Sequence, residues 1–174
     1  MIKSLLVTSG YPRSGNTYLN QALNLLYYPE QEVNLSSHSA KVISKPGTII
    51  VPLRNPLDAI SSWHKFPLPS TMLEDVNFYI RFYSTVVNNL HKVCLMDFNK
   101  FTVDVDYIKD QIFKHFKINA SHYVSDFDVK KVMIENEKEN NLPRNNQEEL
   151  QAVKKLISNT EGFDTCLELY NKLI

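Results

Sequence analysis

The chain has 174 residues, of which 43% are hydrophobic and 22% charged, a balance typical of a globular domain with its own core. Its 19 basic and 19 acidic residues cancel, so the net charge gives no reason to expect nucleic acid as a partner. No apolar run reaches the ~20 residues of a membrane span, and the N-terminus lacks a signal-peptide pattern. We therefore predict one domain over residues 1–174, without membrane association.

The chain contains two cysteines, Cys94 within the apolar segment KVCLMDF and Cys166 near the C-terminus. Neither has the spacing of a metal or redox motif. Because unpaired, reduced cysteines are typical of intracellular proteins, we predict a cytoplasmic location.

Short apolar segments alternate with longer segments in which apolar residues recur at helical spacing. The apolar segments predict strands at residues 2–8, 33–36, 48–53 and 93–98. Helical periodicity and helix-start signals predict helices at residues 16–28, 56–66, 71–90, 107–116, 126–139, 147–157 and 163–173. This alternation predicts the α/β class, with a parallel sheet flanked by helices on both faces.

A glycine-rich segment, GYPRSGNT at residues 10–17, lies between the first predicted strand and the first predicted helix; we call it the cradle. Gly10, Gly15 and Thr17 have the spacing of the P-loop, G-x-x-x-x-G-K-[ST]. Such a turn directs backbone N–H groups at an anion and places it at the positive end of a helix. The lysine position holds Asn16, but Arg13 lies two residues before the second glycine, so we predict a phosphate site whose cation is Arg13.

A second anion motif, RNPLDAISSW at residues 54–63, follows the third predicted strand. Asn55 is the predicted N-cap of a helix, Pro56 takes its first position, and Asp58 completes the capping pattern. Arg54 ends the strand and Ser62 lies about two turns along the helix. We expect the guanidinium and the hydroxyl to close on one phosphate group.

The segment YPRSGNTYL resembles the 5′-phosphosulfate loop of the sulfotransferases, whose usual form is Y-P-K-S-G-T-T-W-L. This chain has Arg13 for the lysine, Asn16 for the first threonine after the glycine and Tyr18 for the tryptophan. The segment RNPLDAISS resembles the 3′-phosphate motif of that family, R-N-P-x-D-x-x-x-S. The resemblance covers residues 1–65; beyond them KVCLMDFNKF is a looser match, with Met96 in place of an expected tyrosine.

The resemblance implies a P-loop-like sulfotransferase fold and a donor, 3′-phosphoadenosine-5′-phosphosulfate (PAPS). Arg13 would neutralise the leaving oxygen, while Arg54 and Ser62 would recognise the 3′-phosphate. Relatives carry a late basic loop, often R-K-G, over that phosphate; here NLPRNN offers Arg144, for which a solvated loop arginine is the alternative. The residues implied to contact the donor are Arg13, Ser14, Gly15, Asn16, Thr17, Tyr18, Arg54, Ser62 and Arg144.

The resemblance also implies a catalytic base, the histidine of the family's K-x-H segment, which corresponds to His38 in LSSHSAK. A neutral imidazole suits proton transfer near neutral pH, although a polar loop histidine is the alternative. Ser36 stands where the family has its lysine, and the nearby cations are Lys41 and Lys45. Some relatives use a glutamate as base, so the further candidates are Glu30 and Glu32.

We therefore predict a PAPS-dependent sulfotransferase that needs no metal and acts on a hydroxyl or amine of a small-molecule or glycan acceptor. Two alternatives stay open. One is a metal-dependent P-loop phosphotransferase, with Asp97 of VCLMD as magnesium ligand. The other is a non-catalytic nucleotide-binding module that keeps both motifs.

Overall fold

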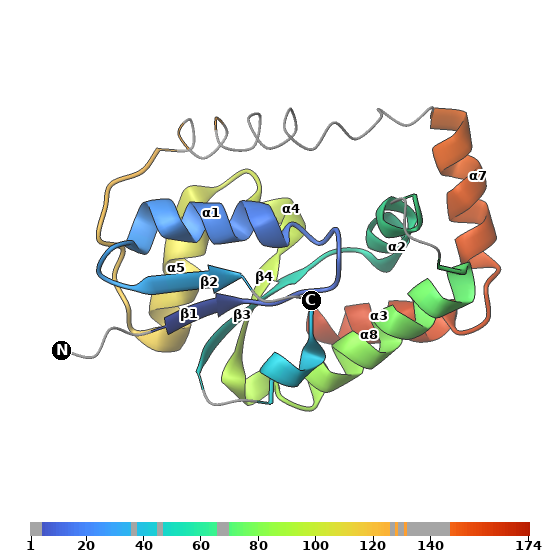
Figure 1. Ribbon diagram of the computed structural model, residues 1–174, viewed down its shortest axis with the longest axis horizontal. Coiled ribbons are helices and arrows are strands. Elements are labelled where there is room, and N and C mark those ends of the chain that lie inside the picture. The colour runs from blue at the N-terminus through green and yellow to red at the C-terminus, as the bar shows by residue number, and fades with distance from the viewer. Residues whose placement is uncertain are drawn as a thin grey trace.

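The computed structural model describes residues 5–35, 38–44, 47–65, 70–125, 128, 131 and 147–174. Its four strands form one parallel sheet in the order β2-β1-β3-β4, covered by helices on both faces (Figure 1). This confirms the predicted α/β class. The strands are β1 (Leu5–Thr8), β2 (Glu32–Leu35), β3 (Thr48–Leu53) and β4 (Val93–Asp97).

The helices agree with the predicted ones to within a few residues at their ends. They are α1 (Asn16–Tyr27), α2 (Pro56–His64), α3 (Met72–Val87), α5 (Val105–Phe116), α7 (Gln147–Ser158) and α8 (Phe163–Leu173). The sequence pattern did not predict the short helix α4 (Phe98–Phe101) or the 3-10 turns at Ala40–Val42 and Leu90–Lys92. Most of the helix predicted at 126–139 lies outside the described residues. No helix in the described part of the chain is long and apolar enough to cross a membrane.

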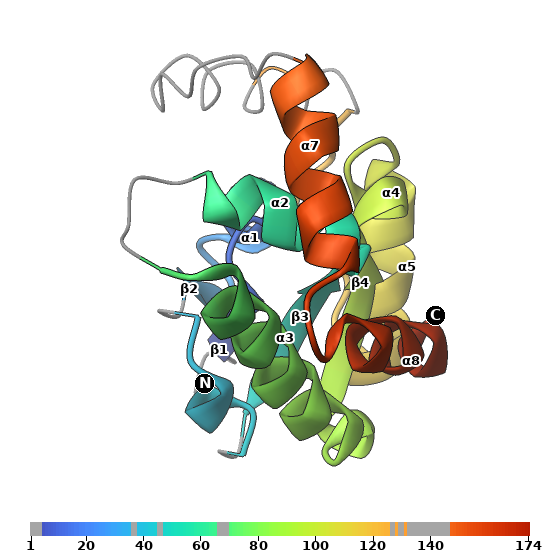
Figure 2. The ribbon, with the colours of Figure 1, turned by 90° about the vertical axis from the view of Figure 1, so that its right-hand side faces the viewer.

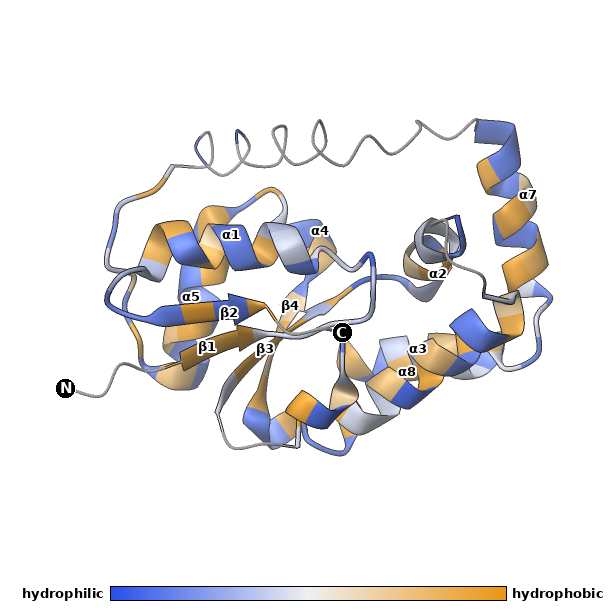
Figure 3. Ribbon diagram, in the orientation of Figure 1, coloured by the Kyte–Doolittle hydropathy of each residue, from blue (hydrophilic) through white to orange (hydrophobic). Residues whose placement is uncertain are grey.

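Two hydrophobic cores lie on opposite faces of the sheet. The side chains of β3 alternate between them: Ile49 and Val51 pack with α2, α3 and α8, whereas Ile50 packs with α1, α4 and α5. A strand that is buried on both faces reads as a continuous apolar run, which explains the segment TIIVPL. In Figure 3 the central strands β1 and β3 are accordingly hydrophobic, while the edge strand β2 carries hydrophilic residues.

All four strands end at the same edge of the sheet, because every pairing is parallel. The cradle follows β1, His38 follows β2, Arg54 follows β3 and α4 follows β4. The helices after β1 and β3 pack on opposite faces, and the order of the strands along the sheet reverses between β1 and β3. Open parallel sheets bind ligands at such a reversal, outside the carboxyl ends of the strands. The fold therefore brings both predicted anion motifs to this position.

Candidate anion-binding site

The cradle ends where α1 begins, and nothing in it caps the helix. Gly15 is the N-cap, with a left-handed φ of 85°, and within the described part of the chain the helix start has no side-chain cap hydrogen bond. A side chain at this position would also approach the rings of Phe98 and Phe101, because a Cβ would lie 2.9–3.0 Å from them. No acidic residue occupies the first turn, where Thr17 is exposed. The helix start thus presents unsatisfied donors and a positive dipole end to an anion.

Arg13 joins the cradle to the second motif. Its Nε donates a hydrogen bond to Oγ of Ser62 at 3.1 Å, across 49 residues of sequence. The Arg13 backbone has a φ of 62°, a left-handed conformation that is uncommon outside glycine and concentrates at functional sites. The guanidinium is half-buried, and this burial lowers its pKa. Because Ser62 accepts from Arg13, its own hydroxyl hydrogen remains available to a ligand.

Arg54 lies beside Arg13 at the end of β3. Its Nη1 donates to the carbonyl oxygen of Arg13 at 2.7 Å, and its guanidinium lies 4.4 Å from the centre of the Phe98 ring. Burial lowers the pKa of Arg54; the charge of Asp58 opposes this shift and that of Arg13 adds to it. Among the described residues no carboxylate forms an ion pair with Arg54. Two cations that are partly removed from water and adjacent to each other are stabilised by an anion.

Asn16, in the lysine position of the P-loop pattern, faces the inside of the loop. Its side chain is 4% exposed, and Nδ2 donates to the carbonyl oxygens of Tyr11 at 2.9 Å and Gly10 at 3.3 Å. The Asn16 side chain therefore braces the cradle and offers a ligand only its backbone N–H. The N–H of Ser14 is likewise used within the loop, since it donates to Tyr11 at 3.2 Å. Ser14, one of the residues implied to contact the donor, therefore uses its backbone N–H within the loop.

His38 contacts the cradle directly, although 28 residues separate it from Gly10. Its Nδ1 lies 2.9 Å from the Gly10 carbonyl oxygen and 3.4 Å from Nδ2 of Asn16. A carbonyl oxygen only accepts, so Nδ1 carries the hydrogen, and the neutral ring has its lone pair on Nε2. The His38 backbone is also left-handed, with a φ of 52°. His38 is thus bound to the cradle in a tautomer that can accept a proton at Nε2.

The first turn of α1 packs against the short helix α4. The Tyr18 ring stacks on Phe101 with 5.7 Å between ring centres, and its hydroxyl donates to the Phe101 carbonyl at 3.3 Å. Phe98 of the same helix lies under Arg54. An aromatic wall composed of Tyr18, Phe98 and Phe101 therefore borders the cradle on the β4 side. The sequence pattern missed this wall because the helix that carries two of its members has only four residues.

The loop is fixed from the other face by α3. The hydroxyl of Tyr11 donates to the backbone oxygen of Asp75 at 3.3 Å, and burial raises the pKa of Tyr11. Asp75 is 2% exposed, and its Oδ2 lies 2.8 Å from Nδ1 of His64. No sequence pattern indicates a role for Asp75 or His64. Their partnership joins α2 to α3 directly behind the cradle.

Several predicted residues lie elsewhere. Glu32 pairs with Leu5 at the amino edge of the sheet, and Glu30 lies beyond the far end of α1, 3.4 Å from His122. Since α1 spans roughly 18 Å, neither glutamate reaches the cradle, and their proposal as bases is wrong. Met96 is fully buried, so it contacts no ligand. Three further predicted residues lie outside the described residues: Ser36, Lys45 and Arg144.

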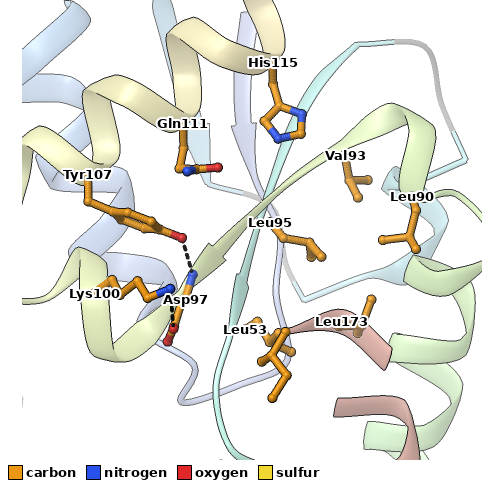
Figure 4. A pocket seen from close by; sticks show the side chains of 11 residues that line it. Leu53, Leu90, Val93, Leu95, Asp97, Lys100, Tyr107, Gln111, His115 and Leu173 are labelled. Atoms are coloured by element: carbon orange, nitrogen blue, oxygen red, sulfur yellow. Dashed lines mark hydrogen bonds and ion pairs between the residues drawn. The ribbon is translucent and has the colours of Figure 1, made fainter. Parts of the chain in front are cut away.

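A separate cavity of about 280 Å³ lies along the edge strand β4. Figure 4 shows Tyr107, Gln111 and His115 of α5 on one side of it and Leu173 of α8 on the other. Asp97, the magnesium ligand of the alternative hypothesis, lies at its end. Its Oδ1 caps α4 by accepting from the N–H of Asn99 at 3.0 Å, and its Oδ2 lies 3.6 Å from Lys100. The charge of this carboxylate is therefore offset within the chain.

Comparisons with protein-family models, with curated proteins and with solved structures find no match to this chain. A functional proposal therefore rests on the geometry of the site.

Proposed function

We propose that this protein is a PAPS-dependent sulfotransferase with the fold of that family, acting on a hydroxyl or amine of a small-molecule or glycan acceptor. One observation carries the proposal: the two anion motifs are in direct contact. Arg54 donates to the backbone of Arg13, and the side chain of Arg13 donates to Ser62. The donor has a 5′-phosphosulfate and a 3′-phosphate, so it requires two anion sites that lie close together.

The residues present fit this donor. The uncapped start of α1 and Arg13 would hold the 5′-phosphate, while Arg54 and the free hydroxyl hydrogen of Ser62 would bind the 3′-phosphate. When bound, PAPS supplies an activated sulfuryl group to the acceptor. Arg13 would stabilise the negative charge on the departing phosphate oxygen, the role that preorganised cations play in group transfer.

His38 is the proposed general base. It follows β2, whereas Arg54 follows β3, and β1 with its cradle lies between them. With this order, the proposed proton acceptor and 3′-phosphate site would lie on opposite sides of the cradle, so that an acceptor on the β2 side would avoid the nucleotide. Nε2 of His38 would take the proton of the attacking hydroxyl, because Nδ1 already donates to Gly10.

The alternative of a metal-dependent phosphotransferase needs a cation in the P-loop lysine position and a free acidic ligand. Asn16 braces the loop instead, and Asp97 is bound to Asn99 and Lys100. Both observations favour the sulfotransferase.

Calorimetric binding to adenosine 3′,5′-bisphosphate, AMP and ATP tests the donor assignment. We expect the bisphosphate to bind more tightly than AMP, and to do so in EDTA as well as in magnesium. Preference for ATP that depends on magnesium would establish the phosphotransferase alternative.

A measurement of turnover distinguishes an enzyme from a non-catalytic nucleotide-binding module. We expect bisphosphate to be released from PAPS, in EDTA, when sugars, phenols or tyrosine peptides are supplied as acceptors. Tight bisphosphate binding without release across this panel would indicate the non-catalytic module.

A further inference from the structure

Helix α7 contacts the second anion motif through one ion pair. Nζ of Lys154 lies 2.6 Å from Oδ1 of Asp58, across 96 residues of sequence. Figure 2 shows α7 standing beside α2, whose first turn contains Asp58. The sequence predicted that Asp58 completes the cap of α2. In the structure Asn55 caps the helix alone, by accepting from the N–H of Leu57 at 3.0 Å, and the Asp58 carboxylate reaches α7 instead.

Asp58 is also the acidic residue whose charge acts on Arg54, four residues before it in sequence. Arginine and carboxylate form strong paired hydrogen bonds when their geometry allows it. In the described residues Arg54 nevertheless has no ion pair, and its Nη1 binds the Arg13 carbonyl. The carboxylate that would compete most directly with a bound anion is held by a different cation.

We propose that Lys154 is a positioning residue of the anion site: it holds the Asp58 carboxylate, so that Arg54 remains available to bind a phosphate group. The inference rests on the proposed function, because it concerns the phosphate assigned to Arg54. Helix α7, in the second half of the chain, would then influence donor affinity although it does not contact the donor.

The ion pair between Lys154 and Asp58 contributes little to the free energy of folding, and its main effect is on where the Asp58 charge lies. Asp58 is 43% exposed and Lys154 is 23% exposed, and a partly exposed pair contributes little to folding. An unpaired Asp58, in contrast, would act on Arg54, whose charge is only partly solvated and already feels this carboxylate. Its carboxylate would then satisfy Arg54 internally and weaken binding of any external anion.

The test is a double-mutant cycle read by calorimetric binding of adenosine 3′,5′-bisphosphate. K154M should weaken binding by about three- to tenfold, the effect of one competing carboxylate at a half-exposed site. D58N should bind at least as tightly as the wild type, and D58N with K154M should match D58N alone. K154R should retain wild-type affinity. K155M is the matched control, since Lys155 is an exposed neighbour on the same helix.

Two other roles for Lys154 give different results, and either would overturn the proposal. If the ion pair mattered only by holding α7 in place, D58N would weaken binding as much as K154M. If Lys154 contacted the anion itself, adding D58N would leave the K154M defect uncorrected.

A ligand-free measurement keeps this inference separate from the proposed function. The Nε–Hε nuclear magnetic resonance signal of Arg54 should shift in K154M, as Asp58 becomes its partner, and return in the double variant; K155M should leave it unchanged. A wild-type protein that fails to bind the bisphosphate would refute the proposed function, while this signal still decides the inference. An Arg54 signal that K154M does not move would overturn it.

Discussion

Nε of Arg13 donates a hydrogen bond to Oγ of Ser62 at 3.1 Å, which joins a loop at the start of α1 to the second turn of α2. The two residues belong to separate anion motifs, 49 positions apart. Under the proposed function, their contact would place a cradle for one phosphate beside a cation–hydroxyl pair for another. A ligand with a single phosphate would use only part of this arrangement.

The first prediction concerns the 3′-phosphate. Arg54→Ala should weaken adenosine 3′,5′-bisphosphate by about 1.5–3 kcal/mol, the range for a hydrogen bond to a charged group, and should change AMP binding much less. Calorimetry with both ligands measures the difference. Arg81→Ala, which removes an exposed arginine of α3, is the control. Equal losses for the two ligands would refute the assignment of Arg54.

The second prediction uses adjacent serines. Ser62→Ala removes the acceptor of Arg13 and should weaken the bisphosphate by about 0.5–1.5 kcal/mol, the net worth of one hydrogen bond. Ser61→Ala is the matched control, because the Ser61 hydroxyl donates to the backbone of Asp58 and has no bond to Arg13. If both variants bind with the same affinity, Ser62 has no special place in the site.

The third prediction concerns the base. His38→Asn keeps a side-chain donor for Gly10 and a residue type that tolerates the left-handed backbone, but removes the proton acceptor. Sulfuryl transfer to an alcohol should fall by about 10²–10⁴-fold, in kcat and kcat/KM together, with bisphosphate affinity retained. His91→Asn, at an exposed histidine, should be unaffected. A His38→Asn enzyme with most of the wild-type rate would show that the base lies elsewhere.

The fourth prediction concerns the brace inside the loop. Asn16→Ala removes two buried hydrogen bonds to the carbonyls of Gly10 and Tyr11, so the free energy of unfolding should fall by about 1–3 kcal/mol. Urea unfolding at neutral pH measures this loss. Asn24→Ala is the control on the same helix, because the hydrogen bonds of the Asn24 amide to described residues go to Asn20, one turn away. Comparable losses in the two variants would contradict the bracing role.

The fifth prediction concerns alkaline pH. Burial raises the pKa of the Cys94 thiol to about 12, against which Lys114 acts weakly. An unfolded thiol ionises near pH ~8.5, so between these values the unfolded state has lost a proton that the folded state keeps. Below about pH 8.5 the Cys94 thiol therefore has no effect on the free energy of unfolding. Between the two pKa values it lowers the free energy of unfolding by at most ~1.4 kcal/mol for each unit by which the pH rises.

Urea unfolding at several pH values between 8 and 11 tests this effect. Cys94→Ala should lose stability at neutral pH by deletion of a buried side chain, yet decline less steeply than the wild type as the pH rises. Val93→Ala, which shortens a buried neighbour on the same strand, should keep the wild-type slope. Parallel declines in the wild type and Cys94→Ala would show that the thiol contributes nothing.

Local signals in the sequence were sufficient for much of the fold. The strand at Thr48–Leu53 and the helix at Phe163–Leu173 have the predicted bounds, because an unbroken apolar run and a helical apolar stripe are complete within a short window. The cap of α2 by Asn55 was predictable for the same reason, because donor and acceptor lie two residues apart in the sequence. The order of cradle, His38 and Arg54 at the ends of successive strands also follows from the sequence, once parallel pairing is assumed.

Tertiary structure decided which of these groups meet. The contacts of Arg13 with Ser62, His64 with Asp75 and Lys154 with Asp58 join different helices and loops, and no periodicity in the chain encodes them. The distance of Glu32 from the cradle likewise depends on the pairing of β2 in the sheet, because a strand's first and last residues lie at opposite edges. Sequence patterns thus determined the elements and the charged groups at their ends. Packing of the helices on the two sheet faces determined which of these groups contact one another.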